Sequence, residues 1–241
     1  MGMSSGRRIV FWDFDGTLAR RDGLFAGAVA DALRMADPAS TLTRDDVYPH
    51  LRVGFPWHSP EVVVDPPEAD EWWWRIEGVF ARAYAELGVS PGTAAAAIPL
   101  IRGEFLRPDS WRHVDGAVEA LETTRAAGYE NVALSNHAPE LPELVEALGL
   151  SPYHERVITS AAVGAEKPNP AIFEYALRVT DASDDVWMVG DNPRADVAGA
   201  EAVGIRAILA DKSHPDPAGV SVLEAAQLIA AAPEGTHSAR D

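Results

Sequence analysis

Short apolar segments alternate with helical segments over residues 114–209, and this alternation limits the fold that the chain can adopt. Strands are expected at 131–134, 156–160, 185–189 and 205–209, with helices at 116–127, 139–148, 170–179 and 194–203. Such alternation is typical of a parallel sheet that helices cover on both faces, with right-handed crossovers. The sequence therefore predicts an α/β fold, a Rossmann-like parallel sheet with helices on both faces.

A further buried strand is predicted near the N-terminus, at residues 8–12, and it leads directly into the sequence DFDGT at 13–17. Alternation along an extended chain places Asp13 and Asp15 on the same side, and Gly16 permits a tight turn after them. Ligands bind at the carboxyl ends of strands in open α/β sheets. Two carboxylates at this position favour a metal-assisted site with an Asp nucleophile, and a solvated strand end with two incidental acids is the alternative.

A block of helices interrupts the α/β pattern between the first strand and the others. Helices are expected around Leu24 to Leu33, at 68–87 and at 93–106, with an irregular proline-rich stretch at 53–60. We therefore expect residues 1–19 and 109–241 to form the α/β core, and residues 20–108 to form an α-helical inserted domain. Residues 233–241 are expected to be a disordered tail.

Composition excludes several classes of function. The 241 residues carry a formal net charge of −17, which argues against nucleic acid or an anionic membrane surface as partner. The chain has no cysteine, so disulfides, thiolate metal sites and thiol catalysis are excluded, and a cytoplasmic location is expected. A phosphorylated ligand would need a local cation to offset the negative charge.

Polar residues also follow three later segments. The strand at 131–134 leads into Ser135-Asn136, which alone is a common turn, and Lys167 lies in a proline-stiffened loop, where a surface lysine is the alternative. The strand at 185–189 leads into Gly190-Asp191, and Asp196 falls in the following helix. A helix dipole would explain Asp196 but leaves Asp191 unexplained.

Taken in order, DFDGT, Ser135-Asn136, Lys167-Pro168 and Gly190-Asp191 with Asp196 resemble the four motifs of the haloacid dehalogenase-like (HAD) hydrolase superfamily. The helical insert after the first motif resembles the type-1 cap of that superfamily. The resemblance implies that Asp13 is the nucleophile and that Asp15 is the general acid and base.

The resemblance also implies roles for the remaining polar residues of these motifs. It implies Mg²⁺ held by Asp13, the main-chain carbonyl of Asp15 and Asp191, which are the hard oxygen ligands that this ion takes. Lys167 and Ser135 are expected to act in catalysis, and Asp196 and Asn192 are expected to support them. The residues expected to bind phosphate or substrate are Gly16, Thr17, Arg20, Asn136 and His137.

The function that follows is hydrolysis of a small phosphorylated metabolite by a monomer or homodimer. Family members that remove halide lack the acid at Asp15, which disfavours a 2-haloacid dehalogenase. A phosphomutase uses the same residues and is the main alternative, and a non-catalytic phosphate-binding protein is a third reading.

Substrate choice is expected to lie in the cap, where the candidates are Trp57, His58, the run 72–74 and the hinge residues Arg20 and Arg21. Three consecutive residues on a helix span most of its circumference, so at least one of these tryptophans must lie away from the main buried face. The run either packs between cap and core or in a dimer contact, or forms a stacking surface for an aromatic or sugar substrate.

Overall fold

The computed structural model describes residues 6–211 and 219–233, and it contains a parallel sheet of five strands in the order β5-β4-β1-β6-β7. These strands are β1 (Arg7–Trp12), β4 (Glu130–Ser135), β5 (Arg156–Thr159), β6 (Ala182–Gly190) and β7 (Arg206–Leu209). The predicted α/β fold is confirmed. The tail expected to be disordered lies outside the described residues, apart from Pro233.

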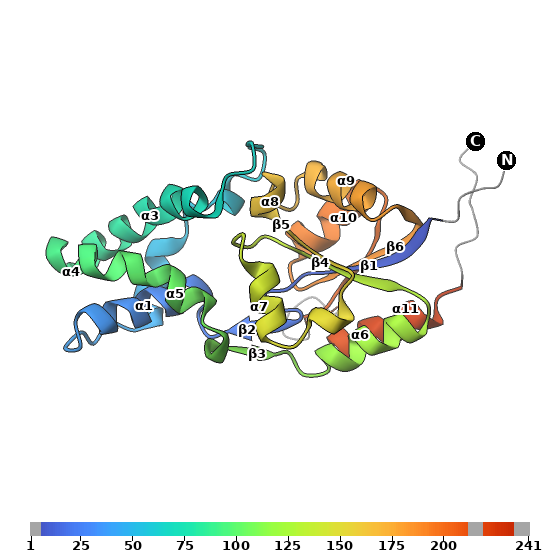
Figure 1. Cartoon of the computed structure of the whole chain (residues 1–241), viewed down its shortest axis with the longest axis horizontal. Coiled ribbons are helices and arrows are strands. Elements are labelled where there is room, and N and C mark those ends of the chain that lie inside the picture. The colour runs from blue at the N-terminus through green and yellow to red at the C-terminus, as the bar shows by residue number, and fades with distance from the viewer. Residues whose placement is uncertain (1–5, 212–218, 234–241) are drawn as a thin grey trace.

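The central strand β1 sends alternate side chains to opposite faces of the sheet. Val10 and Trp12 join one buried cluster, with α6 (Ala117–Ala126), α7 (Leu141–Ala147) and α11 (Val222–Ala231). Ile9 and Phe11 join the other, with α9 (Pro170–Val179) and α10 (Gly199–Ala202), and the one-turn helix α8 (Ser160–Val163) precedes α9. Figure 1 shows α9 and α10 on one side of the sheet and α6 and α11 on the other. Burial on both faces explains why the strand is apolar at every position from Ile9 to Trp12.

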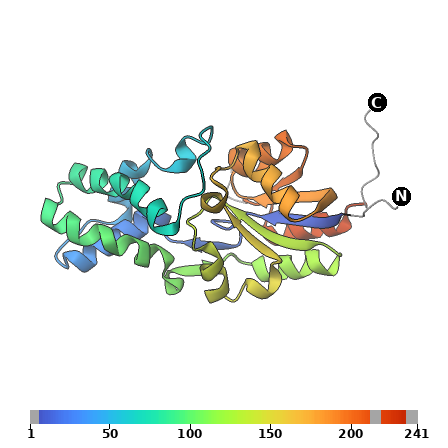
Figure 2. The same ribbon diagram turned by 45° about the horizontal axis from the view of Figure 1, so that its top comes forward.

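The helices between β2 (Ala19–Arg21) and β3 (Trp111–His113) form a separate group beside the sheet, which both views show (Figures 1 and 2). The group consists of α1 (Leu24–Ala36), α2 (Arg44–Val47), α3 (Ala69–Glu86), α4 (Pro91–Ala97) and α5 (Ile101–Leu106), with the short 3₁₀ turns Tyr48–Leu51, Pro56–His58, Ile98–Leu100 and Pro108–Ser110. It has its own buried side chains, among them Leu33, Phe80 and Tyr84. The Tyr84 hydroxyl also donates to the Val29 carbonyl at 2.8 Å, which ties α3 to α1.

Contacts that involve the main chain connect this helical group to the core at two places. The strands β2 (Ala19–Arg21) and β3 (Trp111–His113) pair antiparallel where the chain leaves and re-enters the core. Residues 59–67, which we call the strap, also contact the core loop that contains Lys167. Asn169 Nδ2 donates to the Pro60 carbonyl at 2.8 Å, and Val64 N donates to the Gly164 carbonyl at 2.9 Å.

Several predicted elements differ from the structure. The helix predicted at 93–106 is two helices, α4 and α5, separated by the 3₁₀ turn that contains Pro99, because proline cannot donate the helical hydrogen bond. The helix predicted at 194–203 begins as a π-helix, Pro193–Ala198, in which Val197 N donates to the Asn192 carbonyl at 3.4 Å. The stretch predicted to be irregular contains one short 3₁₀ turn at Pro56–His58.

The sequence interpretation did not include the short elements β2, β3, α2 and α8, nor the ten-residue helix α11. The start of α11 carries a capping box, in which Ser221 and Glu224 bond each other's main-chain N–H groups, so a signal for this helix was present. Across residues 6–211 and 219–233, no helix has the length and apolar character needed to span a bilayer.

Candidate active site

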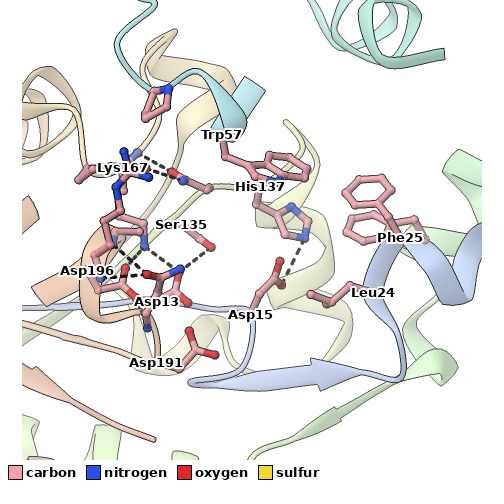
Figure 3. Close-up of a pocket in the computed structure, with 17 residues that line it drawn as sticks. Asp13, Asp15, Leu24, Phe25, Trp57, Ser135, His137, Lys167, Asp191 and Asp196 are labelled. Carbon is pink, nitrogen blue, oxygen red and sulfur yellow. Dashed lines mark hydrogen bonds and ion pairs between the residues drawn. The ribbon is translucent and has the colours of Figure 1, made fainter. Parts of the chain in front are cut away.

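The three central strands end side by side, and their ends carry the acidic residues of the predicted site. Trp12 of β1 lies in register with Ala133 of β4 and Val189 of β6. The next residue, Asp13, donates its main-chain N–H to the Val189 carbonyl at 2.8 Å. Asp13, Ser135 and Asp191 therefore meet at one edge of the sheet, and they line the pocket shown in Figure 3.

One carboxylate oxygen of Asp13 is held by two donors. Ser135 Oγ lies 2.9 Å and Lys167 Nζ lies 2.7 Å from Asp13 Oδ1. Lys167 also donates to Asp196 Oδ1 at 2.5 Å and to the Leu134 carbonyl at 2.8 Å, so its ammonium has three acceptors (Figure 3). Burial lowers the pKa of Lys167, but Asp13 and Asp196 raise it more, and the lysine is therefore charged at neutral pH. A buried ammonium that bonds two carboxylates is fixed in place.

The loop around Lys167 is tied to the end of β4. The side-chain amide of Asn136 donates to the Lys167 carbonyl at 2.9 Å, and its oxygen accepts the Lys167 N–H at 2.7 Å. The Lys167-Pro168 peptide bond is cis, and Asn169 caps α9 by accepting the Ala171 N–H. Asn136 was predicted to bind phosphate or substrate; in the structure it lines the pocket and its amide positions Lys167.

Asp15 lies deeper toward the helical group and faces His137 (Figure 3). The distance from Asp15 Oδ1 to His137 Nε2 is 3.9 Å, and neither atom has a hydrogen-bond partner among the described residues. Burial, followed by the charges of Asp13 and Asp191, raises the pKa of Asp15 well above its usual value. Burial lowers the pKa of His137 to about 4, so the imidazole is neutral and Asp15 is the group suited to carry a proton.

The acidic residues Asp13, Asp191 and Asp196 form a cluster in which one oxygen of each lies within 4.8 Å of the others. Asp196 is already engaged, because Oδ1 accepts from Lys167 and Oδ2 accepts the Asn192 N–H at 3.0 Å. Burial and the charges of Asp13 and Asp196 raise the pKa of Asp191. Carboxylates that crowd in this way have the chemistry of a hard-cation site, and Asp13 and Asp191 are the members of the cluster that could hold such an ion.

The remaining predicted residues lie at or near this cluster, with two exceptions. Gly16 packs against Asp191, and a Cβ on Gly16 would lie 2.1 Å from Asp191 Oδ2. Asn192 lines the pocket, and its side chain accepts the N–H groups of Arg194 and Ala195. Thr17 is fully buried and lies outside the pocket lining, and Arg20 is exposed on β2 and also lies outside it.

Arg21, the other hinge arginine, is buried and structural. Its guanidinium donates to Asp31 at 2.8 Å and to the Leu24 carbonyl at 3.1 Å.

The three consecutive tryptophans separate as expected for a helix: Trp72 and Trp73 are buried, whereas Trp74 is 70% exposed. None of the three lines the pocket shown in Figure 3, whose described lining includes Trp57.

The sequence interpretation missed four residues of the helical group that line the pocket, namely Leu24, Phe25, Pro60 and Phe105. The pocket encloses about 350 Å³ between these side chains and the strand ends. The local sequence signal for these residues was a glycine at position 23, just before the first helix. In the structure, Gly23 and Leu24 have φ values of 73° and 44°. A non-glycine residue with positive φ is uncommon, and it often marks a functional site.

Comparison with known proteins identifies the family. The model of the haloacid dehalogenase-like hydrolase family matches residues 8–204, and the chain therefore belongs to this family of hydrolases. It is 34% identical over 139 residues to human haloacid dehalogenase-like hydrolase domain-containing protein 3, covering 57% of this chain and 55% of that protein. It is 33% identical over 138 residues to phosphoserine phosphatase of Thermus thermophilus, covering 56% of this chain and 54% of that protein. The chain thus spans somewhat more than half the length of these relatives.

Solved structures agree on the fold. The putative HAD-hydrolase YfnB of Bacillus subtilis, whose structure was determined with bound magnesium, superposes with a TM-score of 0.69 at 19% identity, over 93% of this chain and 99% of that one. The L-2-haloacid dehalogenase of Xanthobacter autotrophicus superposes with a TM-score of 0.67 at 19% identity, over 92% of this chain and 98% of that one. One fold therefore accommodates both kinds of protein, and the chemistry must be argued from the site.

Proposed function

We propose that this protein is a Mg²⁺-dependent phosphomonoester hydrolase that acts on a small phosphorylated molecule through an aspartyl-phosphate intermediate. The observation that carries the proposal is the asymmetric setting of Asp13. Lys167 and Ser135 hold one oxygen of its carboxylate, so the other oxygen is left to attack. Asp15, with its raised pKa, lies in the same pocket.

In the first step, Asp13 attacks phosphorus, and a bond forms between its carboxylate oxygen and phosphorus while the bond to the leaving oxygen breaks. Asp15 gives its proton to that oxygen, so the product leaves as a neutral alcohol. In the second step, Asp15 takes a proton from water as the water attacks phosphorus, and inorganic phosphate and free Asp13 are released. Lys167 and Ser135 offset the charge of the Asp13 carboxylate throughout.

Asp13, Asp191 and the main-chain carbonyl of Asp15 are the groups proposed to hold Mg²⁺. The ion would supply positive charge where an anionic phosphate must approach an anionic nucleophile. The crowded carboxylates and the raised pKa of Asp191 support this assignment.

The division of the chain follows from the same proposal. Residues 1–19 and 109–241 would form the catalytic core, and residues 20–108 would form a cap over the pocket. The contribution of Leu24, Phe25 and Phe105 to the pocket lining supports a role of this segment in substrate choice.

Two observations bear on the competing functions. A halide leaves without a proton, so a dehalogenase has no need of an acid at the position of Asp15, and the presence of Asp15 favours phosphoryl transfer. The relatives include the Thermus phosphoserine phosphatase and, at 36% identity over 116 residues, a ribulose-1,5-bisphosphate 5-phosphatase of Halopiger xanaduensis. A phosphomutase would use the same core residues and remains the second candidate.

The test is release of inorganic phosphate from a panel of phosphomonoesters, with and without Mg²⁺. The wild-type protein should turn over only with the metal, and Asp13→Asn should reduce turnover by at least a thousandfold because the amide is not a nucleophile. Asp15→Asn should slow esters of alcohols far more than esters with acidic leaving groups, which need no proton. Isomerisation of a sugar phosphate without phosphate release would identify a mutase, and turnover in Asp13→Asn would refute the mechanism.

A further inference from the structure

The pocket has two chemically distinct ends. Among the described residues, the charged members of its lining belong to the core strand ends and the loops that follow them, and they are Asp13, Asp15, Lys167, Asp191, Arg194 and Asp196. The lining residues from the helical group are Leu24, Phe25, Trp57, Pro60 and Phe105, and none of them carries a charge. Figure 3 shows Leu24 and Phe25 on the opposite side of the pocket from Lys167 and Asp196, with Asp15 and His137 between them.

From this division we propose the substrate class: a phosphomonoester whose alcohol part is neutral and apolar, with an aromatic ring or a comparable flat group, and without a second anionic group. This inference rests on the proposed function, because it places the phosphoryl group at Asp13. The alcohol part then extends past Asp15 toward Phe25 and Trp57. That path also puts the leaving oxygen beside the acid that must protonate it.

The apolar end is built from rings in close contact. The Phe25 and Phe105 rings stack at 4.0 Å with 9° between their planes, and Trp57 stacks on Phe55 at 4.4 Å with 8° between planes. Phe25 lies 5.8 Å from Trp57, so the two stacks adjoin. Flat apolar surfaces of this kind bind rings by burial and by offset stacking. Among the described side chains that line the pocket from the helical group, only the Trp57 indole offers a polar hydrogen and none is cationic, so this end has no side-chain charge to pair with an anionic substituent.

The apolar wall is held in a fixed conformation at some cost. Leu24 has a φ of 44°, in the left-handed region that leucine disfavours. The buried Arg21 holds the Leu24 carbonyl at 3.1 Å, and Asp31 holds Arg21 at 2.8 Å. The Leu24 side chain nevertheless remains 39% exposed and lines the pocket. Strain that surrounding contacts maintain at a ligand pocket is consistent with a wall shaped for a ligand.

Charge supports the exclusion of a second anion. Lys167 is already bonded to two carboxylates, those of Asp13 and Asp196. The only other cation in the described pocket lining is Arg194, which is exposed and follows Asp191 and Asn192 on the core side of the pocket. A carboxylate or second phosphate at the apolar end would lose hydration without meeting a side-chain cation among the described lining residues of that end, in a chain of net charge −17. Substrates related to phosphoserine or to a sugar bisphosphate should therefore be poor ones.

Three esters with leaving alcohols of similar acidity test the inference: n-propyl phosphate, 3-phenylpropyl phosphate and the phosphate ester of 4-hydroxybutanoate. We expect kcat/KM for the phenylpropyl ester to exceed that of the propyl ester by at least tenfold, and that of the carboxylate ester by more. Trp57→Ala should reduce the preference for phenylpropyl over propyl at least fivefold, because kcat/KM for the phenylpropyl ester should fall more than kcat/KM for the propyl ester. The matched control is Trp74→Ala, because Trp74 is 70% exposed and lies outside the pocket lining; it should change neither value.

A second variant tests the charge argument by gain of function. Leu24→Lys places an ammonium at the exposed apolar wall, and it should improve the carboxylate ester at least tenfold relative to the phenylpropyl ester. Arg194→Gln should leave the ranking of the three esters unchanged. If instead the carboxylate ester equals or exceeds the phenylpropyl ester in the wild type and Arg194→Gln abolishes that activity, the substrate carries a second anion at the core side and the proposal is wrong.

The corresponding phosphonates, measured by calorimetry in the presence of Mg²⁺, separate substrate class from chemistry. If the esters are hydrolysed at equal rates and the phosphonates bind equally, the hydrolase assignment stands and the substrate class is refuted. If no ester is hydrolysed but the phenylpropyl phosphonate binds at least tenfold more tightly than the other two, the inference about the pocket holds and the proposed hydrolysis fails.

Discussion

At the scale of single residues, the site depends on how closely main chain and carboxylate approach each other at Gly16. This glycine has a φ of 91°, and an added Cβ would lie 2.1 Å from Asp191 Oδ2. Gly16→Ala should therefore displace the Asp191 carboxylate as well as strain the turn. We expect the variant to bind Mg²⁺ at least tenfold more weakly, measured by titration of activity against Mg²⁺ concentration.

Gly149→Ala is the matched control for this change. Gly149 has a φ of 72°, and an added Cβ would meet no atom within 4 Å. The control should cost about 1 kcal/mol of folding free energy through backbone strain alone and keep the Mg²⁺ affinity of the wild type. If the two variants have the same Mg²⁺ affinity, the contact between Gly16 and Asp191 has no role in metal binding.

The sequence predicted which polar residues follow strands, because apolar segments such as 8–12 mark strand ends clearly. It could not predict where each side chain points after the strand ends. Asn136 and Ser135 are neighbours, yet Ser135 donates to Asp13 whereas Asn136 bonds the main chain of Lys167. Arg20 and Arg21 are likewise neighbours, and alternation on the short strand β2 leaves one exposed and the other buried. The direction of each depends on contacts with segments far away in the sequence.

At the scale of elements, the loop from α8 to α9 carries a buried acid, Glu166, directly before Lys167. Glu166 is 5% exposed, and burial raises its pKa from 4.5 to about 7. The folded protein therefore binds this proton more tightly than the unfolded chain does. Below pH 4.5 the Glu166 carboxyl is protonated in both states and costs no folding free energy. As the pH rises the folded state becomes less stable, and the loss is complete above pH 7.

Glu166→Gln should remove this penalty because the amide has the same shape and no charge. At pH 8 the variant should be more stable than the wild type by up to about 3 kcal/mol, and near pH 4.5 the two should be equal. Urea unfolding at both pH values measures the difference. Glu174→Gln, an exposed change on α9, should shift neither value by more than about 0.5 kcal/mol. A Glu166→Gln variant that is less stable at pH 8 would mean that the carboxylate is ionised and paired in the folded protein.

The sequence predicted well the elements with a clear apolar pattern, such as the helical spacing of apolar residues in α3 and the continuous apolar run in β1. Short elements escaped because their stability comes from distant partners. The three residues of β2 pair with β3, about ninety positions further along the chain, and neither segment is apolar throughout. The break between α4 and α5 was readable, because Pro99 lies inside the predicted helix. The π-helix after β6 was not, since the Asn192 contacts that shape it leave no mark on sequence periodicity.

At the scale of the whole molecule, the carboxylates of the site add locally to a chain that is already strongly acidic. Burial and the charges of Asp13 and Asp196 raise the pKa of Asp191 to about 8, which means that the metal-free fold resists ionisation of this residue. The cluster therefore opposes folding without a cation and favours cation binding when the protein is folded. Site chemistry and global stability are linked through the same charges.

This linkage predicts opposite effects of one substitution in two buffers. In EDTA at pH 8, Asp191→Asn should be more stable than the wild type, because it removes a crowded negative charge. In saturating Mg²⁺ the wild type should gain stability, about 2.7 kcal/mol when the free ion is at one hundred times its dissociation constant, whereas Asp191→Asn should gain far less. Asp115→Asn removes the same charge from an exposed loop position, and this control should follow the wild type in both buffers. Thermal unfolding of the three proteins with and without Mg²⁺ measures the effect, and an equal Mg²⁺ response in Asp191→Asn and the wild type would place the ion elsewhere.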